Sequence, residues 1–314
     1  MSTIHDALET YLALRRELGS QMRGPAARLR RFVKFLDRER AGVITTELAL
    51  RWATAPAGVA SATWAQRLGD VRRFAAWLSA TDSQTEVPPQ GLLPERYSRR
   101  PPYIYTDEEI ARIVREAARL PSPRGLRASS YATLFGLLAV TGLRIGEALA
   151  LDRDDVDLRG GILRVRRAKF GKSRFVPLHD STRQALRRYE KRRDTLVPRP
   201  SSPAFLLSER GKRVTQCSAR YNFAVVSRAV GLRAPTTGGR HGHGPRLHDM
   251  RHRLAVRTLI RWYQEGRNVE RELPKLSTYL GHVHVADTYW YLEAVPELLR
   301  LATERAMAPR EDAP

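Results

Sequence analysis

The sequence is poor in cysteine, and Cys217 is the single thiol among 314 residues. One cysteine excludes an intrachain disulfide framework and fits a reducing cytosol. No apolar run comes near the roughly 18 residues that a membrane span needs, and no secretory leader opens the chain. We therefore expect a cytoplasmic protein that has no membrane partner.

Acidic residues are scarce beside basic ones, since 33 Asp and Glu face 55 Lys and Arg for a net charge of +22. Basic residues outnumber acidic ones by 16 to 10 up to Tyr103 and by 39 to 23 after it, so both parts of the chain are basic. Such a charge attracts a polyanion, and the preponderance of arginine favours bidentate contact with phosphate. Double-stranded DNA is the expected partner, which places the protein at the nucleoid.

Motifs of nucleotide-dependent and metal-dependent enzymes are absent from the sequence. It contains no P-loop, no dinucleotide-binding fingerprint and no acidic metal cluster. His241, His243 and His248 lie close together, but without the cysteine, carboxylate or helical i, i+4 partners that accompany a metal site. We expect no metal and no cofactor, and we interpret the segment 236–245 as a loop that faces DNA.

Helical periodicity dominates the first 80 residues and predicts helices at residues 5–18, 25–40, 46–53 and 62–79. The segment 87–102 has five prolines and few apolar residues, so it is expected to be an extended linker. A small helical domain would precede this linker, and a larger domain would follow it.

The larger domain is predicted to be mainly helical with a small β-hairpin. A capping-box pattern at residues 106–109 predicts a helix to about residue 120. Two β-rich runs, 162–166 and 174–178, are joined by a turn that contains Gly171. Further helices are expected at residues 131–140, 182–193, 216–229, 248–264, 274–280 and 285–292.

Three basic residues stand near expected helix starts. At Arg144, a guanidinium and free backbone N–H groups can converge on an anion. His248 and Arg251 are spaced i, i+3 on one helix face, so they can hold a phosphate and exchange a proton with a nearby hydroxyl. Glu147 is expected to hold a neighbouring side chain in place. His252 is expected on another face, in packing or hydrogen bonding.

Further candidates lie on either side of these residues. His282 follows a glycine at an expected helix end. Tyr289 and Tyr291 are about 200° apart around a helix, so both cannot face one site, and periodicity does not choose between them. Lys169 and Lys172 lie in the turn between the β-rich runs, where a lysine can donate a proton to a leaving oxygen or contact phosphates.

The order of these residues resembles that of the tyrosine recombinase (phage integrase) family. The matching stretches span about half of the chain in the expected order, and the N-terminal region is similar to the helical core-binding domain of the family. The stretches are TGLRIGEAL at 141–149, KFGKSRFVPL at 169–178, LHDMRH at 247–252, LGH at 280–282 and TYWYL at 288–292.

The resemblance implies a helical core-type (SAM-like) DNA-binding domain at residues 1–86, a linker at 87–102 and a catalytic domain at 103–314. This catalytic domain would be mixed α/β and would end in an oligomerisation helix, and the two domains would form a clamp around DNA. The residues that we expect to contact DNA are Arg67, Arg72, Arg73, Lys172, Arg174 and Arg240.

The resemblance also implies roles for the candidate residues. Arg144 and Arg251 would grip the non-bridging oxygens of the scissile phosphate and stabilise charge in the transition state. His248 would assist proton transfer as general base toward the tyrosine, and His282 would hydrogen-bond the phosphate.

The two open choices are decided by spacings typical of the family. Lys169 lies eight residues before Pro177, which makes it the general acid for the 5′-hydroxyl leaving group, with Lys172 as its competitor. The nucleophile lies nine residues after the histidine of the Gly-His step, and this spacing selects Tyr291.

The implied activity is site-specific recombination through a 3′-phosphotyrosyl intermediate, for integration, excision or transposition of a mobile element. Family members act as tetramers on two DNA sites, which allows sister recombinases as partners. The segments 263–272 and 236–245 depart from compact members, the first as an apparent extra stretch. Relaxation of DNA by a type IB topoisomerase and architectural DNA binding without catalysis are the alternatives.

Overall fold

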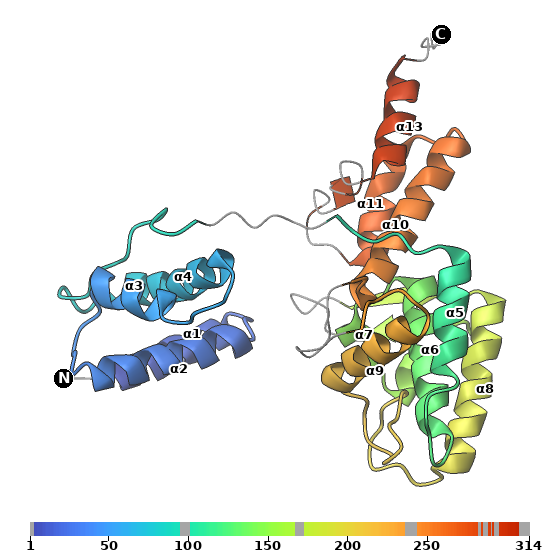
Figure 1. Cartoon of the computed structure of the whole chain (residues 1–314), viewed down its shortest axis with the longest axis horizontal. Helices are drawn as coiled ribbons and strands as arrows, with labels where there is room; N and C mark the ends of the chain where they lie inside the picture. Colours follow the sequence, from blue (N-terminus) through green and yellow to red (C-terminus); the bar gives the residue numbers. More distant parts are fainter. Residues whose placement is uncertain are drawn as a thin grey trace. The chain divides into compact units, whose positions relative to one another are not determined.

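The computed structural model describes residues 3–94, 101–166, 173–235, 244–281, 284, 288–289, 291 and 295–307. The chain forms two compact units, Met1–Arg100 and Pro101–Pro314 (Figure 1). The described residues are mostly helical, with one small sheet, which confirms the expected fold class. None of the described helices is long and apolar enough to cross a membrane.

Four helices make up the first unit, and each lies within two residues of its predicted bounds. They enclose a core of aromatic and aliphatic side chains in which Phe32, Trp52 and Phe74 are buried. The ring of Phe32 packs edge-on against that of Trp52, with 5.2 Å between centroids. The helices are α1 (Ile4–Glu17), α2 (Arg23–Arg38), α3 (Thr46–Thr54) and α4 (Ser61–Leu78).

The beginning of the expected linker is fastened to the first unit. Arg72 of α4 donates from Nε to the carbonyl of Pro88 (2.7 Å) and from Nη2 to that of Pro89 (2.8 Å). Just before these prolines, the Glu86 carboxylate accepts from the backbone N–H of Thr46 at 2.8 Å. Residues 86–89 therefore belong to the surface of the helical unit.

The second unit combines eight α-helices with a three-stranded antiparallel sheet among its described residues. The strand order is β1-β2-β3, and the pairing of Leu163 with Val176 sets the register of the predicted hairpin. The elements are α5 (Asp107–Ala117), α6 (Leu126–Thr141), α7 (Ile145–Ala150), the 3₁₀ turn η1 (Arg153–Asp155), β1 (Val156–Asp157), β2 (Ile162–Val165), β3 (Arg174–Pro177), α8 (Asp180–Leu196), α9 (Gln216–Ala229), α10 (Leu247–Gln264), α11 (Val269–Leu280) and α13 (Pro296–Met307). Thr288, Tyr289 and Tyr291 are also helical.

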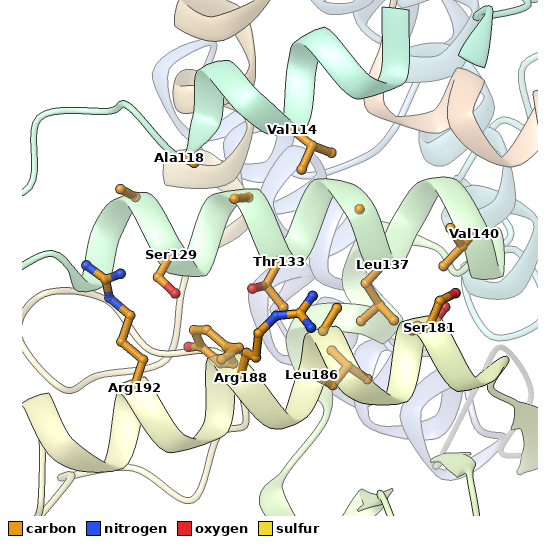
Figure 2. A pocket seen from close by; sticks show the side chains of 16 residues that line it. Val114, Ala118, Ser129, Thr133, Leu137, Val140, Ser181, Leu186, Arg188 and Arg192 are labelled. Atoms are coloured by element: carbon orange, nitrogen blue, oxygen red, sulfur yellow. The ribbon is translucent and has the colours of Figure 1, made fainter. Parts of the chain in front are cut away.

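The apolar helix α6 is the centre of this unit. Leu134, Phe135 and Leu138 are buried in its core, and α5, α8 and α10 all pack against it. Figure 2 shows α6 running between α5 and α8. At its end, Gly142 adopts φ 61°, and the chain turns directly into α7. The core therefore fixes the point at which Arg144 begins the next helix.

Two predicted helix starts were wrong. Helix α6 begins at Leu126 rather than residue 131. Its first turns contain the polar Ser130, which is buried because its hydroxyl donates to the Leu207 carbonyl at 2.6 Å. Helix α11 begins at Val269, and Pro274 lies inside it instead of starting it. Most of the expected extra stretch 263–272 therefore belongs to α10 and α11, which are separated by only four residues, 265–268.

Several predicted features lie wholly or partly outside the described residues. Of the loop 236–245, only Gly244 and Pro245 are described, and of the helix 285–292, only Thr288, Tyr289 and Tyr291 are. The candidate residues outside the described ranges are Lys169, Lys172, Arg240, His241, His243 and His282.

Candidate active site

Arg144 is held at the start of α7 by contacts to the end of α11 and to Glu147 of α7 itself. Its Nη2 donates to the carbonyl of Gly281 at 3.0 Å, and Nη1 lies 3.4 Å from the carbonyl of Leu280. Nη1 also donates to Oε1 of Glu147 at 2.9 Å. The side chain keeps 31% of its surface exposed, so it can still meet a ligand.

Arg251 lies deeper, on α10, and is 2% exposed. Its Nη1 donates to the carbonyl of Gly142 (2.8 Å) and its Nη2 to that of Leu280 (2.6 Å). The pKa of Arg251 falls to about 10, mainly because the group is buried and also because Arg144 lies close, while Tyr291 acts in the opposite direction. The group remains charged at neutral pH, although its two hydrogen-bond acceptors are uncharged carbonyls.

Glu147 fixes the position of the arginines around it. Arg174 of β3 donates to both of its carboxylate oxygens, at 3.0 and 2.8 Å, and Arg144 donates to the same carboxylate. Burial alone would raise the pKa of Glu147, but the hydrogen bond and charge of Arg174, followed by those of Arg144, lower it below its usual value. The expected role of Glu147 in holding a neighbouring side chain is confirmed.

Gly281 allows Arg174 to approach the end of α11. Arg174 also donates from Nε to the carbonyl of Tyr279 at 2.9 Å. Gly281 has φ 68°, and a Cβ atom at this position would lie 2.7 Å from Nη1 of Arg174. A residue with a side chain would be strained in backbone conformation and would displace the guanidinium. The glycine thus lets the Arg174 side chain of β3 reach the C-terminal end of α11.

His248 occupies the first turn of α10 and is exposed. Its pKa is nevertheless lowered to about 4, first because the surrounding protein removes water from the imidazole, and then because the charge of Arg251 disfavours protonation. At neutral pH the ring is therefore uncharged. It can donate one hydrogen bond and accept another.

His252 lies beside His248 and not on another helix face, so that prediction was wrong. Residues spaced i, i+4 are neighbours on a helix, and the two rings meet edge to face with 4.6 Å between centroids. Nδ1 of His252 lies 3.2 Å from the hydroxyl oxygen of Tyr291. The expected hydrogen-bonding role of His252 is confirmed, and its partner is the candidate nucleophile.

The two candidate tyrosines occupy different environments. Tyr291 is 2% exposed and packs in a cluster with Val256 and Leu280, whereas Tyr289 is 45% exposed. Tyr291 also lies close enough to Arg251 for its charge to affect the pKa of the guanidinium. The structure thus brings Tyr291 to the arginine and histidine residues, and its role as nucleophile remains a prediction.

Four residues predicted for catalysis come together from three parts of the chain: Arg144 from α7, His248 and Arg251 from α10, and Tyr291. The sequence indicated Arg144, His248 and Arg251 individually, but it did not indicate that the carbonyl of Leu280 would be shared by both arginines. Lys169 and His282 lie outside the described residues and remain predictions.

Of the arginines expected to contact DNA, the four that the structure describes are engaged within the protein, and their DNA contacts remain predictions. Arg67 donates to the carbonyl of Trp52 at 2.6 Å and stacks 3.7 Å above its ring. Arg73 forms an ion pair with the buried carboxylate of Asp70, although 58% of its side chain is exposed. Arg174 is only 11% exposed, so the structure gives it a positioning role that the sequence did not indicate.

A cavity of about 680 Å³ lies between α5, α6 and α8 and has no residue in common with this site (Figure 2). Small and aliphatic side chains line most of it, and Arg188 and Arg192 extend along it from α8. In the part of the chain that the structure describes, no cluster of three or more His, Cys, Asp or Glu side chains could hold a metal ion.

The comparisons with known proteins agree with this geometry. The sequence model of the phage integrase family matches residues 104–297. The protein y4rB of Sinorhizobium fredii, named as an integrase or recombinase, is 46% identical over 316 residues, which cover 99% of each chain. Tyrosine recombinase XerC of Mycobacterium sp. (strain JLS) is 31% identical over 315 residues, or 98% of this chain and 99% of XerC.

A solved structure shows the same fold. The Tn1549 transposon integrase, in complex with transposon right end DNA, superposes with a TM-score of 0.64. The superposition covers 98% of this chain and 100% of that one, at 16% sequence identity.

Proposed function

Because this chain belongs to the phage integrase family of tyrosine recombinases, we propose that it is a site-specific DNA recombinase whose nucleophile is Tyr291. The observation that carries the proposal is the position of the Tyr291 hydroxyl, 3.2 Å from an imidazole and beside the buried charge of Arg251. A phenol next to cationic donors and a proton acceptor is suited to attack a phosphodiester.

The arginines bind and stabilise the phosphate. Arg144 and Arg251 donate to neutral carbonyls, and a non-bridging phosphate oxygen is a stronger acceptor for the same N–H groups. Their charges oppose the negative charge that develops on the pentavalent phosphorus. His248, uncharged and exposed beside them, donates a hydrogen bond to the phosphate.

Cleavage by Tyr291 gives a 3′-phosphotyrosyl enzyme and a free 5′-hydroxyl, so the energy of the phosphodiester is retained for rejoining. In this proposal Lys169 protonates the leaving 5′-oxygen, and His282 donates to the phosphate. Rejoining requires no nucleotide cofactor, because the bond that is broken in cleavage is replaced by the bond to tyrosine.

The proposed partners are double-stranded recombination sites and further copies of the chain. Helix α13 exposes Leu299 (57%) and Met307 (79%), and these apolar side chains support contact with another subunit in a homotetramer, with sister recombinases as further members. The net charge of +22 supports association with the nucleoid in the cytoplasm. The names of the relatives support integration, excision or transposition of a mobile element.

A nicked suicide substrate tests the proposal. Duplexes carrying the DNA sequences that flank the gene are incubated with the wild type, Tyr291→Phe and the matched control Tyr289→Phe. We expect a covalent adduct, visible on a denaturing gel, with the wild type and Tyr289→Phe, and a loss of at least about 1000-fold with Tyr291→Phe.

An adduct that persists in Tyr291→Phe and disappears in Tyr289→Phe would contradict the assignment of the nucleophile. Exchange of strands between two such sites, without relaxation of a supercoiled plasmid by single subunits, is the expected outcome for a recombinase. Relaxation alone would show that the chain is a topoisomerase.

A further inference from the structure

We infer that His252, rather than His248, accepts the hydroxyl proton of Tyr291 during cleavage; the inference rests on the proposed role of Tyr291 as nucleophile. Nδ1 of His252 lies 3.2 Å from the hydroxyl oxygen, within the distance required of a general base. The rings stand at 63° with their centroids 5.4 Å apart, so the imidazole meets the phenol through its edge and not its face.

The burial of the pair favours transfer between its two members. His252 is 9% and Tyr291 2% exposed, so solvent has little access to the proton. The hydroxyl donates and Nδ1 accepts when the neutral imidazole carries its hydrogen on Nε2. In a site with little water, a fixed acceptor replaces the solvent that would otherwise receive the proton.

His248 is less suited to this task. It is exposed in the first turn of α10, and the loss of water around its imidazole, followed by the charges of Arg251 and Arg144, disfavours its protonation. With a pKa lowered to about 4, it is a weak base, whereas a neutral imidazole beside a phosphate is an effective donor. The two histidines therefore divide the work: His248 contacts the phosphate, and His252 serves the nucleophile.

The contact between the two rings supports this division. The His248 ring stands edge to face against His252, at 87° and 4.6 Å between centroids. Because both side chains come from successive turns of one helix, the ring of His248 limits the rotation of His252 and holds Nδ1 toward the phenol. His248 thus positions the acceptor in addition to binding the phosphate.

In cleavage, the hydroxyl proton of Tyr291 moves to Nδ1 of His252 while the phenolic oxygen forms its bond to phosphorus. The bond from phosphorus to the 5′-oxygen breaks, and its electron pair leaves with that oxygen, which takes a proton from the general acid proposed at Lys169. In rejoining, the 5′-hydroxyl attacks and gives its proton back to the general acid proposed at Lys169, and the imidazolium of His252 returns its proton to the departing phenolic oxygen.

The experiment first replaces His252, the inferred proton acceptor, and then uses a more acidic nucleophile that depends less on an acceptor. His252→Asn keeps an oxygen near the position of Nδ1 that can accept a hydrogen bond but cannot take up a proton at neutral pH. We expect single-turnover cleavage of the suicide substrate to fall by at least about 100-fold, the usual effect of losing a general base. Melting temperature and DNA affinity, measured on the same sample, report folding.

The rescue uses a more acidic nucleophile. Tyr291 is replaced by 3,5-difluorotyrosine, whose phenol is partly ionised at neutral pH, in the wild type and in His252→Asn. If His252 accepts the proton, we expect the difference between the two backgrounds to shrink to less than about tenfold, since an ionised nucleophile needs no base. In His248→Asn, the part of the defect that comes from the lost phosphate contact remains after fluorination, so this variant is rescued less than His252→Asn.

The matched control is His179→Asn. His179 caps α8 with Nδ1, which accepts from the backbone N–H of Ser181, and asparagine also caps helices well. We expect its cleavage rate to stay within about twofold of the wild type, since it lies outside the site and surface substitutions have small effects. If His252→Asn fails to fold, His252→Gln takes its place in the same comparison.

The outcomes are distinct. Cleavage by His252→Asn within about threefold of the wild type, or a defect that fluorination leaves unchanged, contradicts the inference while the proposed function stands. Rescue of His248→Asn in place of His252→Asn assigns the proton acceptor to His248. If the wild type forms no adduct, the proposed function fails together with the inference.

Discussion

The arginines around Asp70 in the first unit and Arg251 in the second unit have partners of different charge. In the first, Arg28 and Arg73 flank the buried carboxylate of Asp70, which compensates their charge. In the second, the hydrogen bonds of Arg251 go to the carbonyls of Gly142 and Leu280, which carry no net charge. A buried cation with neutral partners retains its attraction for an anion. The arginine content alone therefore does not locate the phosphate site, whereas the deep burial of Arg251 beside neutral partners marks it.

The largest expected effect comes from comparing the removal of Arg251, which has neutral partners, with the removal of Arg28, which is paired with a carboxylate. Arg251→Ala should lower covalent adduct formation by about 1000-fold or more, because it removes a charge and two donors from the transition state. Arg28→Ala should cost the first unit about 1–3 kcal/mol, because it takes a partner from a buried carboxylate. Adduct formation by Arg28→Ala at saturating DNA should stay within about tenfold of the wild type, since the chemistry of the second unit is intact.

Single-turnover cleavage and urea unfolding of both variants check this expectation. An equal loss of cleavage in Arg251→Ala and Arg28→Ala would contradict this expectation, because it would show that charge compensation does not distinguish the two arginines.

A smaller effect is expected at the glycines that adopt positive φ. Gly281→Ala and Gly266→Ala both meet a φ of 68°, but only at Gly281 does the new Cβ fall close to Arg174. We expect Gly266→Ala to cost about 1 kcal/mol from backbone strain and Gly281→Ala about 1–3 kcal/mol more from the displaced guanidinium.

Urea unfolding of the two variants, of Arg174→Ala and of the double variant Gly281→Ala/Arg174→Ala measures the difference. Arg174→Ala removes the obstructing group, so Gly281→Ala should destabilise the Arg174→Ala background less than it destabilises the wild type. If the destabilisation is the same in both backgrounds, the contact between Gly281 and Arg174 is not the cause.

The smallest effect is the pH dependence due to His248. Its pKa is about 4 in the folded protein against 6.5 for an ordinary histidine, so between these values the unfolded chain binds more protons. Stability should therefore decrease as pH falls from 6.5 to 4, and His248→Asn should show less of this decrease. Melting temperatures of both proteins over this range test the sign, and equal slopes would contradict it.

Much of this arrangement could be predicted from the sequence, for local reasons. Helix α5 was predicted from the capping box of Thr106 and Glu109, and both of its hydrogen bonds are present. Arg144, His248 and Arg251 were indicated because each lies at or near a helix start. The i, i+4 spacing of His248 and His252 is also a local pattern, and it is typical of two side chains that are neighbours on a helix.

What could not be predicted depends on contacts between distant segments. The start of α6 was missed because Ser130 is polar, yet it is buried through bonds to Tyr189 and Leu207. The role of Arg174 depends on Glu147, 27 residues earlier, and on a carbonyl 105 residues later. Local patterns carry no information about such partners.

The shared carbonyl of Leu280 gives α11 a function that its side chains do not reveal. Since both Arg144 and Arg251 bond to this oxygen, its position sets the separation of the two guanidinium groups. Deleting one residue anywhere between Val269 and Leu280 would turn the carbonyl by about 100° and move it by about 1.5 Å. The site therefore constrains the length of this helix, and we expect α11 to tolerate substitutions more readily than the deletion of a residue.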